Sequence, residues 1–316
     1  MYKDRKGELL ACLPDTVKNA CFLLQNKELM KKASELRLRR DRVQSLTVGK
    51  EAYILSRDGL FEKQPYAPVM LTEKQLRDSV ERLCDGSVFA CSETIRYGFV
   101  TKCGCRVGIS GKAVTENGKI CGFREYDALN IRFSRHIPDA AAPLLRFIAE
   151  NGFGKIGGIL LVSPPGIGKT TMLRSLCAAL ASGFSDGGTR RRARVFIADE
   201  REEIYMPEVF EKTLCDFLSD CPKAQAIELA TRVLSPEFIV CDEIGNDGEA
   251  DAVLRGASGG IVFIAACHGN SIEELYQKRQ TARLLREGVF GTVCILSEQN
   301  GMRRCTVQSV RKGATA

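Results

Sequence analysis

The sequence predicts two domains, an α+β domain at residues 1–138 and a larger α/β domain at residues 139–316 whose parallel sheet is covered by helices on both faces. The length of 316 residues is enough for about two domains, each with its own core. In the first domain apolar and polar residues alternate, whereas in the second the apolar residues form continuous runs between helical segments. With 44% hydrophobic and 27% charged residues, the composition excludes collagen-like and disordered chains.

The first domain begins with a helical pattern and continues as strands. Apolar residues recur at helical spacing over 14–33, and alternation over 43–55 predicts strands. Thr72 and Gln75 form a capping box, which predicts a helix that starts directly after Thr72. Alternating segments between glycines predict further strands over 98–133. This mixture, without a regular βα order, is typical of an α+β domain.

The second domain alternates helical segments with buried strands. A helix is expected at 140–150, followed by a glycine-rich turn at 151–158. Continuous apolar runs then predict five strands, at 159–162, 194–198, 238–241, 261–266 and 292–296. The segment 182–194, SGFSDGGTRRRAR, is expected to be a flexible loop with a basic end.

The net charge of +7 lies entirely in the first half of the chain. Residues 1–150 contain 26 Lys and Arg against 19 Asp and Glu, and residues 151–316 contain 20 against 20. The split predicts different partners for the two halves, although so modest an excess is also typical of a solvated surface. The apolar runs are too short to span a membrane and the charged amino terminus lacks a secretory signal, so we expect a cytoplasmic protein without direct membrane insertion.

Residues 163–171, SPPGIGKTT, have the pattern of a Walker A phosphate loop. The segment follows the strand GILLV and opens the helix MLRSLCAAL. Its glycines let the backbone curl around phosphates, Lys169 can reach the β- and γ-phosphates, and Thr170 can bind Mg²⁺. The first glycine of the usual pattern is replaced by Ser163, which predicts some strain or a weaker affinity for nucleotide. The residues expected to bind ATP are Ser163, Pro164, Pro165, Gly166, Ile167, Gly168, Lys169, Thr170 and Thr171.

Acidic residues follow two of the buried strands, and a histidine follows a third. Asp242 is expected to hold Mg²⁺ through water, and Glu243 to polarise the attacking water. Glu200, in the acidic segment after 194–198, is expected to help position the water or the metal. His268 ends the strand at 261–266 and is expected beside Asp242, in contact with the γ-phosphate. The alternative interpretations are an N-cap role for Asp242 and Glu243, a solvated acidic loop around Glu200, and a structural role for His268.

These segments resemble a known family. PPGIGKTTMLRSL, ADEREEI, LSPEFIVCDEIG and CHG in the second domain, with SELRLRR, YGFVTKCGCRVGISGKAV and LNIRFSRHIP in the first, resemble the stage III sporulation protein AA family. Cys105 departs from that pattern, which more often has histidine there. The resemblance implies a RecA-like ATPase related to type II and type IV secretion ATPases, with ATP and Mg²⁺ as ligands. It also implies a homo-oligomeric ring, a hexamer, that docks on membrane proteins of the channel between mother cell and forespore.

A ring of this kind needs cations from the neighbouring subunit at the γ-phosphate, as arginine fingers provide. In the related secretion ATPases such arginines come from the amino-terminal domain or the linker, which makes Arg124, Arg132 and Arg135 the candidates here. The alternative for each is an ordinary surface or ion-paired arginine.

Two other functions remain open from the sequence. A nucleic-acid-binding ATPase would use the basic runs RLRRDR and TRRRAR, but aromatic residues make up only 7% of the chain and do not interleave with either run, so the case for nucleic acid is not strong. A nucleotide-gated scaffold would bind ATP with little turnover, which Ser163 leaves possible.

Overall fold

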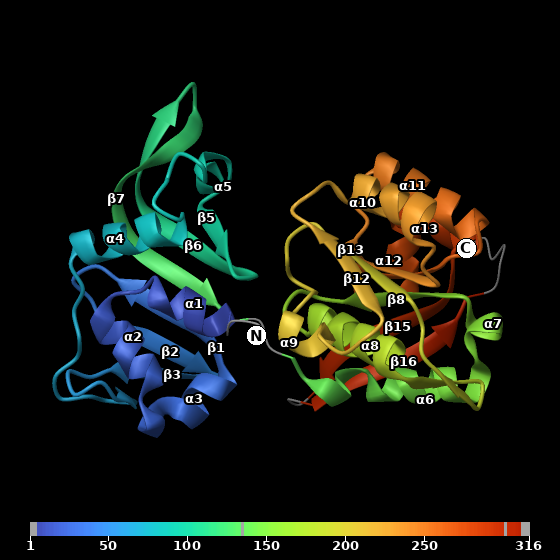
Figure 1. Cartoon of the computed structure of the whole chain (residues 1–316), viewed down its shortest axis with the longest axis horizontal. Helices are drawn as coiled ribbons and strands as arrows, with labels where there is room; N and C mark the ends of the chain where they lie inside the picture. The colour runs from blue at the N-terminus through green and yellow to red at the C-terminus, as the bar shows by residue number, and fades with distance from the viewer. Residues whose placement is uncertain (1–4, 134–135, 300–301, 311–316) are drawn as a thin grey trace. The chain divides into compact units, whose positions relative to one another are not determined.

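A computed structural model describes residues 5–133, 136–299 and 302–310. The chain divides into two compact units, Met1–Arg135 and His136–Ala316 (Figure 1). The division lies three residues before the boundary expected from the sequence, 138/139. Within the described residues, no helix is long and apolar enough to cross a membrane.

The first unit contains a seven-stranded sheet in the order β4-β3-β2-β1-β7-β6-β5, with antiparallel pairing throughout. Strands appear at both segments that the alternation indicates. Their bounds are β1 Ala33–Arg39, β2 Ser45–Val48, β3 Glu51–Leu55, β4 Phe61–Glu62, β5 Phe99–Lys102, β6 Cys105–Glu116 and β7 Lys119–Arg132. Leu36 and Leu38 of β1 face the core, whereas Arg37 and Arg39 alternate with them on the other face.

Helices cover the apolar face of this sheet, because Leu9, Val17 and Val80 share one core with Leu36. The helices are α1 Arg5–Ala11, α2 Asp15–Phe22, η1 Leu24–Asn26, α3 Lys27–Lys32, α4 Glu73–Leu83 and α5 Ser92–Arg96. The predicted capping box is confirmed: the Thr72 side chain accepts a hydrogen bond from the Gln75 main-chain N–H at the start of α4.

The single helix expected over 14–33 is wrong, since three short helices stand there. Leu23 adopts extended backbone angles (φ −59°, ψ 137°) that end α2. The buried side chain of Asn26 then donates hydrogen bonds to the carbonyls of Ala20 and Gly59, and accepts one from the main-chain N–H of Phe61. These long-range bonds outweigh the local helical periodicity.

The second unit is built on a seven-stranded sheet in the order β12-β11-β13-β14-β8-β15-β16. All five predicted strands are present, and every pair is parallel except β15 with β16. The bounds are β8 Gly158–Ser163, β11 Val195–Asp199, β12 Cys215–Ser219, β13 Phe238–Glu243, β14 Val262–His268, β15 Phe290–Gln299 and β16 Met302–Ser309. The edge strands β12 and β16 were not expected, because neither has a continuous apolar run.

Two cores, one on each face, confirm the doubly covered parallel sheet. Leu161 of β8 packs with α6 and α8, whereas Leu160 packs on the other face with α10, α11 and α13. The helices are η2 Pro138–Ala141, α6 Ala142–Asn151, α7 Phe153–Ile156, α8 Lys169–Ser182, α9 Pro207–Phe210, α10 Lys223–Leu229, η3 Ala230–Leu234, α11 Asp247–Ser258, α12 Ile272–Gln277 and α13 Arg279–Arg286.

The segment 182–194 is not the flexible loop that its composition predicts. It contains a hairpin of β9 Phe184–Asp186 and β10 Thr189–Arg191. The Arg191 guanidinium pairs with Asp186 at 2.9 Å and with Glu237 at 2.6 Å, and lies over the ring of Phe184. Ion pairs and ring contacts therefore fix a stretch whose composition predicts a flexible loop with a basic end.

Candidate functional site

The phosphate loop joins β8 to α8 at the carboxyl edge of the sheet. Gly166 (φ 80°) and Gly168 (φ 115°) take the positive φ values that the glycines of the motif predict. Ser163 is the buried last residue of β8, and its φ is not positive, so serine in place of the usual glycine does not strain this loop. The Ser163 hydroxyl donates to the carbonyl of Pro164 at 2.7 Å.

Lys169 begins α8 and turns back over the loop. Its ammonium donates to the carbonyl of Ser163 at 2.8 Å and lies 2.9 Å from Nδ1 of His268. Burial lowers the pKa of Lys169, and the nearby carboxylate of Glu243 opposes this effect. The amine is therefore held where phosphates would meet the amino terminus of α8.

His268 connects the loop to Glu243. It ends β14 in register with Ser163 of β8, and its ring nitrogen Nε2 lies 3.7 Å from a carboxylate oxygen of Glu243. The main-chain N–H of His268 donates to the same carboxylate at 3.3 Å. The sequence places His268 beside Asp242, but its contacts on β13 are with Glu243, one residue further along.

Lys278, at the junction of α12 and α13, also belongs to this group and was not expected. Its ammonium donates to the carbonyl of His268 at 2.6 Å and lies 3.5 Å from the Glu243 carboxylate. A lysine between two short helices has no sequence pattern that would single it out.

Asp242 and Glu200 meet around a second unexpected lysine. Lys223, the first residue of α10, forms an ion pair with Asp242, and its ammonium lies 3.8 Å from Glu200 and 3.6 Å from Glu249. Its side chain is only 4% exposed, and it donates to the main-chain carbonyl of Glu243 at 2.5 Å. Sequence reasoning missed it because α10 follows β12, the edge strand that was also missed.

Asp199, the neighbour of Glu200, has a structural role. Its buried carboxylate accepts hydrogen bonds from the main-chain N–H groups of Glu203, Ile204 and Tyr205 at 2.7 to 3.1 Å. Burial raises the pKa of Asp199, while these hydrogen bonds act in the opposite direction. Asp199 therefore stabilises a tight turn, and its oxygens are engaged there rather than at the phosphate loop.

The residues expected to hold Mg²⁺ fit that ion. Thr170 in the first turn of α8 and Asp242 at the end of β13 supply a hydroxyl and a carboxylate, the hard oxygen ligands that Mg²⁺ takes. Asp242 already pairs with a cation, the ammonium of Lys223. Among the described residues no three His, Cys, Asp or Glu side chains gather closely enough to hold a metal by themselves, so phosphates would have to complete the shell.

A largely apolar cavity of about 310 Å³ opens beside the phosphate loop. Its walls come from the start of the second unit, the loop and α8, and β15 with β16. They are formed by Ile137, Asp139, Ala140, Pro143, Ile167, Gly168, Thr171, Met172, Leu296, Arg304 and Cys305.

The arginine candidates belong to the first unit. Arg132 is exposed at the end of β7, in register with Glu35 of β1, and Arg124 is exposed further up the same strand. Arg135 lies outside the described residues. Arg132 shares the open face of the sheet with Arg37 and Arg39, because the register pairs β7 with β1 residue by residue.

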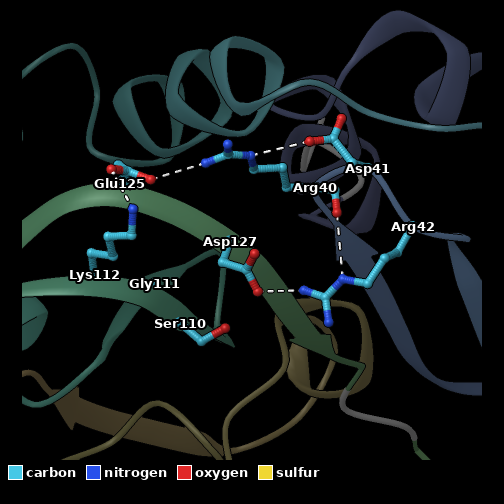
Figure 2. A pocket seen from close by; sticks show the side chains of 8 residues that line it. All are labelled: Arg40, Asp41, Arg42, Ser110, Gly111, Lys112, Glu125 and Asp127. Carbon is cyan, nitrogen blue, oxygen red and sulfur yellow. Dashed lines mark hydrogen bonds and ion pairs between the residues drawn. The ribbon is translucent and has the colours of Figure 1, made fainter.

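The end of the basic run RLRRDR lines a hollow in this unit, but its arginines Arg40 and Arg42 are paired with acids (Figure 2). Arg40 lies 3.0 Å from Glu125, which also pairs with Lys112, and Arg42 pairs with Asp127. The arginines Arg191 and Arg194 of the second basic run likewise pair with Glu237. Paired guanidinium groups are poor phosphate contacts, which weighs against nucleic acid as the ligand.

Comparisons with known proteins agree with this architecture. The ATPase DotB of Legionella pneumophila has a similar fold, with a TM-score of 0.59 at 13% identity over 92% of this chain and 78% of DotB. The pilus retraction motor PilT, solved with bound ADP, gives a TM-score of 0.53 at 13% identity over 92% of this chain and 84% of PilT. The fold is therefore a RecA-like α/β domain preceded by an antiparallel α+β domain, as the sequence predicts.

The sequence comparisons are more specific. The stage III sporulation protein AA of Bacillus subtilis (strain 168) is 32% identical over 302 residues, which cover 93% of this chain and 92% of that protein. The profile of the family described as "Sporulation stage III, protein AA" matches residues 3–314. The chain belongs to the stage III sporulation protein AA family, and its fold is similar to those of the ATPase DotB and the pilus retraction motor PilT.

Proposed function

We propose that the protein is a Mg²⁺-dependent ATP hydrolase that drives or assembles a membrane-associated channel, the one between mother cell and forespore in endospore formation. The observation that carries the hydrolase is the line of contacts from Lys169 through His268 to Glu243, across the carboxyl ends of three adjacent strands. Membership of the sporulation family supports the channel.

Each group has a distinct task in this proposal. Lys169 and the N–H groups at the start of α8 bind the β- and γ-phosphates. Glu243 orients a water molecule in line with the γ-phosphate and accepts its proton as the new P–O bond forms, and the bond to the ADP oxygen breaks. His268 holds the Glu243 carboxylate and contacts the γ-phosphate. Mg²⁺, when held by Thr170 and Asp242, neutralises charge on the phosphates.

The cavity beside the loop supports a nucleotide over a bare phosphate. Its walls are mostly apolar and it adjoins Gly168 and Thr171. A flat, apolar base is the part of ATP that such a cavity suits.

The direct test is the Lys169→Ala variant. ATP binding by this variant should fall below detection, while Lys155→Ala, an exposed lysine on α7, should bind as the parent does. Equilibrium binding of a fluorescent ATP analogue measures both. If Lys169→Ala binds ATP as tightly as the parent, the phosphate loop has been misassigned.

We further propose that the protein acts as a ring, a hexamer, in which Arg132 or Arg135 of one subunit reaches the γ-phosphate of the next. The support is that Arg132 is exposed on an arginine-rich face and that no arginine is among the residues that contact Lys169, Glu243 or His268 in the described chain. Such a ring would sit on the cytoplasmic side of a membrane complex, in contact with its membrane proteins.

A mixing experiment tests the ring. Glu243→Gln and Arg132→Ala subunits, each inactive alone, should regain ATP turnover when mixed, because some interfaces then pair an intact Glu243 with an intact arginine. Arg96→Ala, an exposed arginine on α5 that is not a candidate, serves as the control, and specific activity should rise with protein concentration. A monomer by light scattering, with turnover independent of concentration, would contradict the ring. Binding of ATP without any turnover would favour a nucleotide-gated scaffold.

A further inference from the structure

Lys223 is a buried cation that the proposed chemistry does not use. Its ammonium contacts acids from three separate elements: Glu200 after β11, Asp242 on β13 and Glu249 on α11. A lysine that is 4% exposed is uncommon unless it is paired, because an unpaired charge is costly to bury. The arrangement therefore requires the lysine and the acids together.

The ammonium is enclosed by oxygen atoms. Asp242 pairs with it directly, and the carboxylates of Glu249 and Glu200 lie 3.6 Å and 3.8 Å away. The hydrogen bond to the main-chain carbonyl of Glu243 adds a fixed contact at 2.5 Å. The lysine thus ties the ends of β11 and β13 to α11 at one point.

The charge of this region matters to an anionic ligand. Glu200, Asp242, Glu243 and Glu249 would together repel a triphosphate that approaches the neighbouring loop. The Lys223 ammonium cancels part of this negative charge and so weakens the repulsion. It pairs directly with Asp242, the carboxylate expected to bind Mg²⁺.

We propose that Lys223 is the positioning residue and resident counter-ion of this acidic group: it fixes Asp242 and Glu200 and cancels part of their charge, so that metal-free ATP can bind and Asp242 is shared between Lys223 and Mg²⁺. This inference rests on the proposed function. Removal of the ammonium makes the site more negative, which weakens the binding of metal-free ATP and strengthens the pull on Mg²⁺.

The measured quantity is the ratio of two ATP dissociation constants, without and with Mg²⁺. In Lys223→Met the ratio should rise by about tenfold over the parent, as expected for the loss of one unit charge close to the ligand. A merely structural defect would weaken both affinities alike and leave the ratio unchanged. The matched control is Lys212→Met, which removes the same charge from an exposed residue. Lys212 precedes β12 and so lies at the amino ends of the strands, away from the phosphate loop at their carboxyl ends.

A double variant separates charge from shape. The Glu249 carboxylate accepts hydrogen bonds from the main-chain N–H of Gly245 and from the Asn246 side chain, outside the phosphate loop, and glutamine keeps one of the two acceptor oxygens. Lys223→Met with Glu249→Gln restores the local net charge, so its ratio should return close to that of the parent. A ratio that stays shifted in the double variant overturns the counter-ion role.

The remaining outcomes are also distinct. Suppose that Mg²⁺ changes the ATP dissociation constant of the parent, but the ratio of the two dissociation constants is the same in Lys223→Met and Lys212→Met. The role of Lys223 is then overturned while the proposed function stands. If the parent itself binds no ATP, with or without Mg²⁺, the proposed function fails and this inference fails with it.

Discussion

The strands β11 and β13 lie side by side, and an Asp-Glu dipeptide stands at the carboxyl end of each, yet the two pairs of acids are used differently. Ala198 pairs with Cys241, so Asp199 and Asp242 are the next residues along each strand. The Asp199 carboxylate accepts hydrogen bonds from three main-chain N–H groups of its own loop, whereas Asp242 forms an ion pair with Lys223. The segment after each dipeptide decides how the acids are used: a tight turn closes over Asp199, and no such turn covers Asp242.

The largest effect is expected at Asp199. The Asp199→Ala variant leaves three N–H groups, one buried and two half-buried, without this acceptor, at about 1–3 kcal/mol each, so the free energy of unfolding should fall by about 3 kcal/mol or more. Urea denaturation measures it, and Asp216→Ala, an exposed acid on β12, should stay within about 0.5 kcal/mol of the parent. A stable Asp199→Ala variant that lacks turnover would contradict the comparison.

Glu243 should show the opposite behaviour. The Glu243→Gln variant keeps shape and hydrogen bonding but cannot take the proton of water, so turnover should fall by about 100-fold or more while ATP affinity is retained. Single-turnover and binding assays separate the two quantities. An unchanged rate would move the base role to Glu200.

Glu200 should give a smaller change in rate. Its carboxylate is 39% exposed and lies 3.8 Å from Lys223, so we expect it to act through the lysine. Glu200→Gln should lower turnover by about tenfold, with a smaller effect than Glu243→Gln under the same conditions. The reverse order of the two effects would exchange their roles.

The smallest effect is expected in the turn that closes over Asp199. Glu202 has a φ of 54°, a left-handed value that glycine adopts without strain. Glu202→Gly should therefore change the free energy of unfolding by no more than about 1 kcal/mol and leave turnover unchanged. A loss as large as that of Asp199→Ala would mean that the Glu202 side chain holds the turn.

The sequence predicts the parts of the second unit that obey one simple rule. A strand buried on both faces has to be continuously apolar, which locates β8, β11, β13, β14 and β15. The phosphate loop is equally visible, because positive φ at Gly166 and Gly168 restricts the residue type.

Other features depend on contacts between residues far apart in the chain. The edge strand β12 is half exposed, with Asp216 as its second residue, so it has no continuous apolar run. Lys223 follows that strand, and only the parallel pairing of β12 with β11 brings it to Asp242. Asn26 likewise ends a helix through its bond to Gly59, which no local pattern shows.

The contact between Lys169 and the carbonyl of Ser163 has a thermodynamic consequence for ligand entry. The loop is already folded, and its lysine already has partners, so an incoming phosphate exchanges one set of polar bonds for another. Little chain entropy is lost and little apolar surface disappears in that exchange. The phosphate part of nucleotide binding should therefore contribute a favourable enthalpy and a small heat-capacity change, unlike the large negative heat-capacity change of a loop that orders around its ligand.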